Sequence, residues 1–142
     1  GYPDAAAESA MLAGHATETP VDAMQSVTDA AGVLRLIDYV RAVETAAPVR
    51  DYAVALANGT REHPLVALGA SPRAGLHLIR AGRARAALAG RRFVIPDDLQ
   101  ALAVPVLAHR LVLSPEASAR GAGAAEIVRS VVAEVPVPMP SR

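Results

Sequence analysis

Cysteine, lysine and tryptophan are all absent from this sequence of 142 residues. Without cysteine there is no disulfide framework, no thiolate nucleophile and no cysteine-based zinc site, and a cytoplasmic location is the simplest expectation. Several phosphate-binding motifs require lysine, whereas all fourteen basic residues here are arginine. The nucleotide-binding motif G-x-x-x-x-G-K-[ST] is therefore excluded, and the chain alone is not expected to hydrolyse ATP.

Long apolar runs and a signal peptide are missing as well. No apolar segment approaches the roughly 20 residues that span a bilayer, and the segment Gly1-Tyr2-Pro3-Asp4 has neither a basic start nor an apolar body. We therefore expect no membrane insertion. Fourteen acidic residues balance the fourteen basic ones, so the formal net charge is zero. Nucleic acid is not an expected partner, because no overall positive field would concentrate it.

Histidine is present, but not in a pattern that binds metal. No histidine has another histidine or a carboxylate at the i, i+4 spacing of a metal site, and the four stand at positions 15, 63, 77 and 109. No G-x-S-x-G segment occurs, and no serine is tied by sequence to a histidine and an acid. The sequence predicts neither a metal site nor a catalytic residue.

The composition favours helices that pack closely through small side chains. Alanine is the commonest residue, 52% of the chain is apolar, and there are only one phenylalanine and three tyrosines. We expect an all-α fold, with one compact bundle of about six helices over residues 1–135 and a proline-rich extended tail at 136–142. A minimal two-stranded ribbon can form if residues 93–95 pair with 111–113.

Apolar residues repeat at helical spacing along most of the chain. Val33, Leu36, Ile37 and Val40 lie at i, i+3, i+4 and i+7, which predicts a helix with one apolar face. Capping residues, prolines and glycines mark further boundaries. They predict a helix after Asp4, a linker from Gly14 to Pro20, a helix from Pro48 to a stop at Asn58-Gly59, the longest helix from Ser71 to Gly90, and later helices after Pro96 and around residues 127–132.

The segment Gly69-Ala70-Ser71-Pro72-Arg73 is the strongest candidate for chemistry. Ser71 can cap the following helix with its hydroxyl, and Pro72 suits the first helical position. These two residues place Arg73 in the first turn, where a cation faces the positive end of the helix dipole at a cost of about 0.3–1 kcal/mol. A phosphate in front of the helix would make this arrangement favourable.

The alternative interpretation is that Arg73 is solvated or paired with a loop acid such as Glu62. Local sequence favours this alternative, and Arg80 on the same face does not establish a basic stripe. Arg61, just beyond the predicted helix stop, either reaches a partner or ties down its own loop. The acids Asp97 and Asp98 are interpreted as structural, because adjacent acids stabilise a helix start.

Five fragments in this order resemble the C-terminal lid of MoxR-family AAA+ ATPases. The resemblance runs almost from end to end, and it implies the same helical layout that the periodicity predicts. The fragments are Gly1-Tyr2-Pro3-Asp4, Thr60-Arg61-Glu62-His63-Pro64, Gly69-Ala70-Ser71-Pro72-Arg73-Ala74, Gly90-Arg91-Arg92-Phe93-Val94-Ile95-Pro96-Asp97-Asp98 and Val106-Leu107-Ala108-His109-Arg110-Leu111.

The resemblance implies that Arg73 is a sensor-2 arginine, which contacts ATP phosphates and couples nucleotide state to lid position. The MoxR family that the sequence resembles consists of ring-forming, chaperone-like ATPases that help to mature or activate other proteins, often with a partner carrying a von Willebrand factor A domain. ATP with Mg would bind to the parent protein, and none is expected to bind tightly to this chain alone. Because the P-loop is missing and Gly1-Tyr2-Pro3 resembles the end of the ATPase core, we expect a separated lid.

Partners implied by the resemblance are the AAA+ core of the same polypeptide and the neighbouring subunits of a ring, to which Arg61 is a candidate contact. Two other functions remain open. One is a helical protein-interaction module in which Arg73 is incidental. The other is a winged-helix-like nucleic-acid-binding module, built from the helix pair 71–90 and 96–109 with the ribbon.

Overall fold

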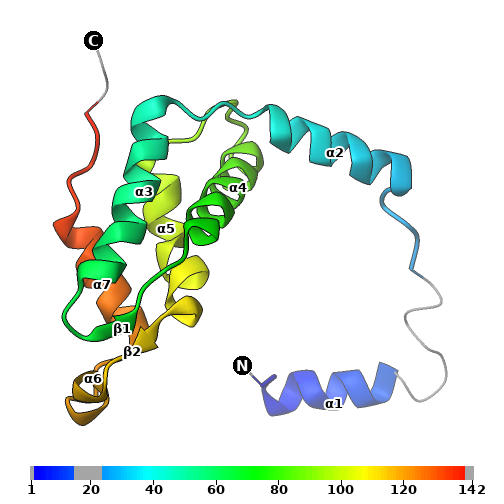
Figure 1. The fold of residues 1–142 in the computed structure, drawn as a ribbon. Helices are drawn as coiled ribbons and strands as arrows, with labels where there is room; N and C mark the ends of the chain where they lie inside the picture. The colour runs from blue at the N-terminus through cyan, green and yellow to red at the C-terminus, as the bar shows by residue number, and fades with distance from the viewer. Residues whose placement is uncertain (1, 15–23, 140–142) are drawn as a thin grey trace. The chain divides into compact units, whose positions relative to one another are not determined.

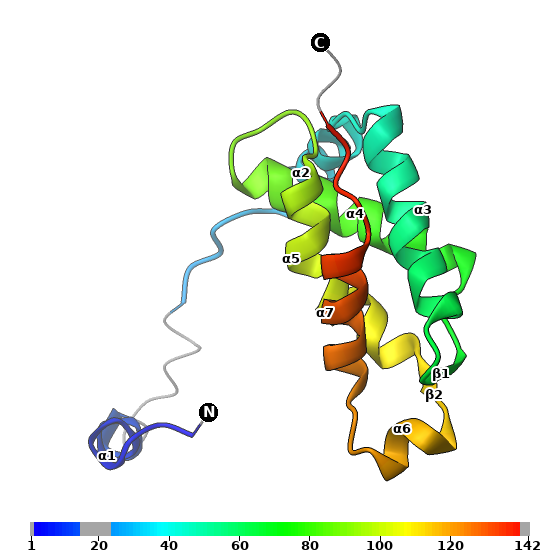
Figure 2. The ribbon, with the colours of Figure 1, turned by 90° about the vertical axis from the view of Figure 1, so that its left-hand side faces the viewer.

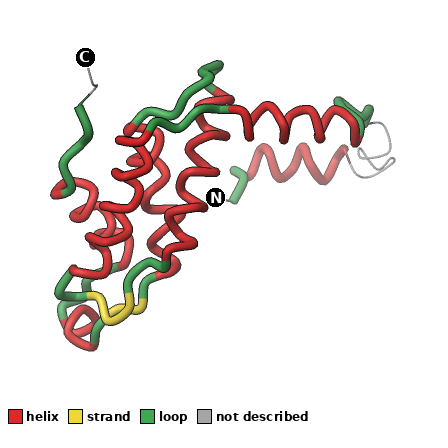
Figure 3. Tube along the Cα trace, turned by 45° about the horizontal axis from the view of Figure 1, so that its top comes forward, coloured by secondary structure: helices red, strands yellow, loops and turns green. Residues whose placement is uncertain are grey.

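The computed structural model describes residues 2–14 and 24–139, so most of the predicted linker from Gly14 to Pro20 lies outside the described residues. Within the described residues the chain forms seven α-helices, one short 3-10 helix and a two-stranded antiparallel sheet. Figure 3 shows this predominance of helix. The prediction of a helical fold with one minimal ribbon is confirmed. Two compact units divide between Arg35 and Leu36.

The first two helices begin at aspartates that cap them. Helix α1 (Ala5–Gly14) follows Asp4, whose Oδ1 accepts a hydrogen bond from the Ala7 N–H at 2.8 Å. Helix α2 (Ala30–Ala42) follows Asp29, whose Oδ1 accepts from the Gly32 N–H at 2.6 Å. The α2 helix forms as predicted, but its apolar residues Val33, Leu36 and Ile37 stay exposed, at 45%, 61% and 41%.

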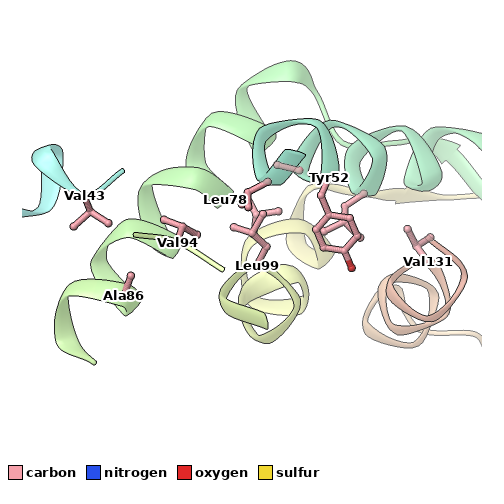
Figure 4. Close-up of a cluster of buried hydrophobic side chains, with 10 residues drawn as sticks. Val43, Tyr52, Leu78, Ala86, Val94, Leu99 and Val131 are labelled. Carbon is pink, nitrogen blue, oxygen red and sulfur yellow. The ribbon is translucent and has the colours of Figure 1, made fainter. Parts of the chain in front are cut away.

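Four helices build the core of the second unit. Figures 1 and 2 show α3 (Ala47–Glu62), α4 (Pro72–Leu88), α5 (Pro96–Leu107) and α7 (Ala124–Glu134) packed against one another. The predicted apolar faces supply the buried side chains, because residues three and four apart share one side of a helix. Figure 4 shows part of this core, which includes Val43, Tyr52, Leu78, Ala86, Val94, Leu99 and Val131.

Short elements close one end of this bundle. Strand β1 (Val66–Leu68) pairs antiparallel with β2 (Val112–Leu113), which follows the 3-10 helix η2 (Ala108–Arg110) and precedes α6 (Pro115–Ala119). The predicted pairing of 93–95 with 111–113 is wrong. Phe93 instead forms an isolated parallel bridge with Glu44. Segments of two or three residues carry too little periodicity to select a partner, so tertiary packing decides it.

Helix α3 continues one turn past its predicted stop at Asn58-Gly59 and ends at Glu62. The glycine serves close packing here, because a Cβ at position 59 would lie only 2.7 Å from Cγ1 of Val131 on α7. The extra turn also buries Thr60 completely. This extension brings the end of α3 next to the segment that precedes α4.

The chain after α7 is extended. Residues 136–139 lie in neither helix nor strand, and Pro138 lines a shallow groove together with Pro48 and Tyr52. Pro140 lies outside the described residues. Among the helices of the described ranges, none has the length and apolar character needed to cross a membrane.

Candidate functional site

The segment before α4 is fixed by contacts from the last turn of α3. The Ala70 N–H donates to Oγ1 of the buried Thr60 at 2.9 Å, and Arg61 Nε donates to the Ala70 carbonyl at 2.7 Å. A Cβ on Gly69 would lie 2.6 Å from the Cα of Arg61, so only glycine fits against this backbone. The loop is therefore held on both its donor and its acceptor side.

Helix α4 starts where the Ser-Pro-Arg sequence predicts, but its cap differs. Ser71 is the N-cap residue and Pro72 opens the helix, yet the Ser71 hydroxyl makes no capping hydrogen bond. The prediction of a hydroxyl cap is wrong. The Ser71 carbonyl instead accepts from the Ala74 N–H at 2.8 Å. The Ser71 hydroxyl is therefore not used in a hydrogen bond to the first turn of α4.

Arg73 projects from the first turn of α4 and is exposed. Among the described residues its guanidinium forms no hydrogen bond and no ion pair, so the alternative pairing with Glu62 is not formed. Arg61 behaves differently: besides its bond to Ala70, its Nη1 donates to Asn58 Oδ1 at 2.8 Å. Arg61 ties down the loop, and Arg73 has its donors available.

An open depression of about 640 Å³ adjoins this helix start. Its lining residues are small or apolar, apart from two arginines that come from different elements, and they include no carboxylate. The lining residues are Arg61, Ala67, Leu68, Gly69, Ala70, Ser71, Pro72 and Arg110. Because its charged residues are all cations, the depression suits an anion.

A histidine and a second arginine meet beside this depression. His77, one turn after Arg73 on α4, lies with its Nδ1 3.2 Å from Nη2 of Arg110. A guanidinium has only donors, so Nδ1 accepts and His77 is neutral. Loss of hydration, and then the charges of Arg110, Arg80 and Arg73, lower the pKa of His77 below 6.5. Histidine protonation is thus disfavoured among these cations.

The sequence alone does not mark His77 and Arg110 as site residues. They stand 33 residues apart, and no periodic pattern links them. The histidine spacings bear only on metal binding, and no group of metal-ligating side chains occurs in the described parts of the chain. The one available signal is the position of Arg110 inside the Val106–Leu111 fragment of the family resemblance.

The opposite end of α4 holds a different arginine cluster. Asp98, with a side chain 2% exposed, accepts two hydrogen bonds from Arg91, at 2.6 and 2.8 Å, and lies 3.3 Å from Arg85 Nε. Its Oδ2 also accepts from the Ile95 N–H at 3.0 Å, which caps α5. Burial alone would raise the pKa of Asp98, but these hydrogen bonds and charges lower it below 3.8.

The sequence matches a known family model and several known proteins. The family model for the AAA lid domain matches residues 58–131, more than half of the chain. A protein of Bacillus subtilis, the uncharacterized protein YeaC, is 37% identical over 139 residues, which are 98% of this chain and 43% of YeaC. Chaperone MoxR1 of Mycobacterium tuberculosis is 42% identical over 73 residues, or 51% of this chain and 19% of that protein.

A solved structure shows the same fold. The crystal structure of a proposed ATPase from Cytophaga hutchinsonii superposes with a TM-score of 0.87 at 24% identity, over 98% of this chain and 45% of that one. The chain thus spans less than half the length of the proteins that it matches. The chain belongs to the AAA lid domain family, and within it resembles the MoxR proteins.

Proposed function

We propose that this chain is the lid of a MoxR-type AAA+ ATPase and that Arg73 is its sensor-2 arginine. In this proposal Arg73 binds a phosphate of ATP that is held, with Mg, by a P-loop core outside this sequence. Contact with the phosphate couples the nucleotide state to the position of the lid. The parent protein is a cytoplasmic, ring-forming, chaperone-like ATPase that acts on other proteins, with a von Willebrand factor A domain protein as a candidate partner.

The observation that carries the proposal is the guanidinium of Arg73 at the start of a 17-residue helix, which has no partner among the residues that the structure describes. The helix dipole favours an anion at this end of α4, whereas a cation alone is disfavoured. Arg73 does not line the depression but follows directly after Gly69–Pro72, which do, and the proposal places the phosphate between the depression and the Arg73 side chain. The guanidinium would then act by electrostatic stabilisation, not by proton transfer.

The comparisons support the parent activity. The family model is that of a lid domain of AAA proteins, and a relative matching half of this chain carries the name of a chaperone. A nucleic-acid-binding function has less support, because fourteen acids balance fourteen arginines and aromatic residues make up only 3% of the chain. The ribbon also forms from residues other than those that the winged-helix idea required.

Replacement of Arg73 by alanine in the complete ATPase tests the proposal. We expect ATP turnover to fall at least about tenfold, because the transition state loses a charge-assisted hydrogen bond. Arg129→Ala on α7 is the matched control, since Arg129 is also exposed and forms no hydrogen bond or ion pair in the described part of the chain. Unchanged turnover and unchanged nucleotide-dependent assembly in the Arg73→Ala protein would show that Arg73 is not a nucleotide sensor.

A further inference from the structure

We propose that Arg110 is a second phosphate-binding residue in the site that Arg73 begins, and that His77 positions it. This inference rests on the proposed function, because it takes the polyphosphate of a nucleotide as the ligand. In this inference the phosphate is bound by Arg110 from η2 as well as by Arg73 from α4, although the two residues are far apart in the sequence.

Two contacts fix the Arg110 guanidinium and leave part of it available. Its Nε donates to the Val106 carbonyl at 3.1 Å, and its Nη2 contacts His77 Nδ1 at 3.2 Å. A guanidinium has five N–H donors, so three remain, including both of Nη1. Arg110 also lines the depression next to Gly69–Pro72. An arginine that is held by its inner edge in this way can present a preorganised outer edge to an anion.

Several cations lie near His77, and among the described residues no acid is paired with its arginine neighbours. Arg73 and Arg80 from α4, with His109 and Arg110 from η2, all act on His77 electrostatically. None of the three arginines forms an ion pair within the described residues. By contrast, Arg85 and Arg91 share Asp98. Like charges repel, so a counter-anion bound nearby would stabilise this group.

A terminal phosphate fits two arginines better than a single carboxylate does. A phosphate presents three oxygens and up to two negative charges, and so can accept guanidinium forks from two directions. A carboxylate carries only one negative charge, so two arginines around it leave an excess positive charge, as around Asp98. The arginines here come from separate elements, α4 and η2. This arrangement favours a polyphosphate over an acidic segment of a protein partner.

Titration of the ¹⁵N-labelled chain at low salt tests the inference. ATP and inorganic tripolyphosphate are added at millimolar concentrations, and the arginine Nε–H signals and the amides of residues 69–73 are followed. In the wild type we expect saturable shifts of Arg73 and Arg110. Arg110→Met should raise the dissociation constant about tenfold, because a charge-assisted hydrogen bond is lost. Arg129→Met is the matched control and should bind as the wild type does.

Two further variants separate binding from folding and from simple packing. Arg110→Lys keeps the charge and the aliphatic stem but loses the fork, so we expect a loss smaller than that of Arg110→Met. The dispersion of the amide spectrum shows whether each variant is folded. His77→Leu should weaken binding less than Arg110→Met does. In the wild type, bound tripolyphosphate should raise the pKa of His77, because it neutralises the surrounding cations; a purely structural contact would leave that pKa unchanged.

The outcomes distinguish this inference from the function on which it rests. Wild-type binding by Arg110→Met together with weakened binding by Arg73→Met would overturn the Arg110 inference alone. Weakened binding by Arg110→Met with wild-type binding by Arg73→Met would support Arg110 and contradict the sensor-2 assignment. A hexaglutamate peptide that shifts Arg110 more strongly than tripolyphosphate would overturn the inference in favour of an acidic protein partner. Absence of saturable shifts with any probe would also overturn it.

Discussion

The two ends of helix α4 hold arginine in opposite ways. At its C-terminal end, Arg85 and Arg91 share the buried carboxylate of Asp98. At its N-terminal end, Arg73 has no acid partner in the described part of the chain, and the next titratable group along that face is His77, whose pKa is lowered by loss of hydration and by the surrounding cations. The helix dipole favours cations at the C-terminal end of α4 and disfavours them at the N-terminal end.

This difference separates arginines whose charge is balanced within the fold from arginines that have no acid partner in the described residues. The Asp98 cluster satisfies itself: the carboxylate binds two guanidinium groups and caps α5, and no buried polar side chain in the described residues lacks a hydrogen bond. The Arg73 cluster has no acid partner in the described residues, and we propose that a bound anion balances its charge. Arginine composition alone therefore says little about function, whereas the presence or absence of acids around each arginine says much.

The largest effect is expected from disrupting the Asp98 cluster at the C-terminal end of α4. Asp98→Ala leaves Arg91 and Arg85 without a carboxylate and uncaps α5, so the free energy of unfolding should fall by about 3 kcal/mol. Urea denaturation measures this change. The neighbouring acid offers a control: Asp97 is exposed, and Asp97→Ala should cost less than about 1 kcal/mol, the scale of a helix-dipole contact. Equal losses in the two variants would contradict the structural assignment of Asp98.

A smaller effect is expected from disturbing the N-terminal end of α4. Gly69→Ala places a Cβ against the backbone of Arg61 and should destabilise the chain by about 1–3 kcal/mol, with displacement of the loop before α4. Gly75 lies inside α4, and a Cβ at this position would meet no atom within 4 Å, so Gly75→Ala should stabilise the chain by up to about 1 kcal/mol. Thermal unfolding of both variants gives the comparison, and a stable Gly69→Ala protein would show that the loop is not tightly held.

The smallest effect is expected in the pH dependence of stability, where the two ends respond in different windows. The pKa of His77 is lowered from 6.5, so its contribution is complete above pH 6.5 and is lost as the pH falls through the folded value. The pKa of Asp98 is lowered from 3.8, so its contribution begins to fall only below that pH. Urea unfolding between pH 8 and acid should show both losses.

Variants assign these windows to residues. His77→Gln should remove the loss that begins below pH 6.5, and Asp98→Asn should remove the loss that begins below pH 3.8. A stability profile of His77→Gln that parallels the wild type between these values would mean that His77 remains free to take up a proton in the folded chain.

Sequence periodicity predicted the long helices because each buries a continuous apolar stripe. The buried face of α3, with Val49, Tyr52 and Leu56, follows the expected spacing. Its end was predicted wrongly, because Asn-Gly is typical of a stop, whereas Gly59 is needed for contact with Val131 on a helix 72 residues later. Local signals do not report contacts of such separation.

The candidate site was predicted only in part, because local sequence motifs do not report contacts between distant residues. Ser71, Pro72 and Arg73 form a local motif whose helix start the structure reproduces, although the Ser71 hydroxyl makes no cap. The contact between His77 and Arg110, like the pairing of β1 with β2, depends on how α4, α5 and η2 pack. Such contacts become visible only in three dimensions, because neither residue belongs to a motif with the other.

The most direct test of the account is a structure of the complete ATPase with a bound ATP analogue. The account predicts that the Arg73 guanidinium lies within about 2.7–2.9 Å of a phosphate oxygen, the length of a charge-assisted hydrogen bond, in the same or a neighbouring subunit. Asp98 should keep its contacts to Arg91 unchanged. An Arg73 side chain in solvent, or paired with a protein carboxylate while nucleotide is bound, would contradict the account.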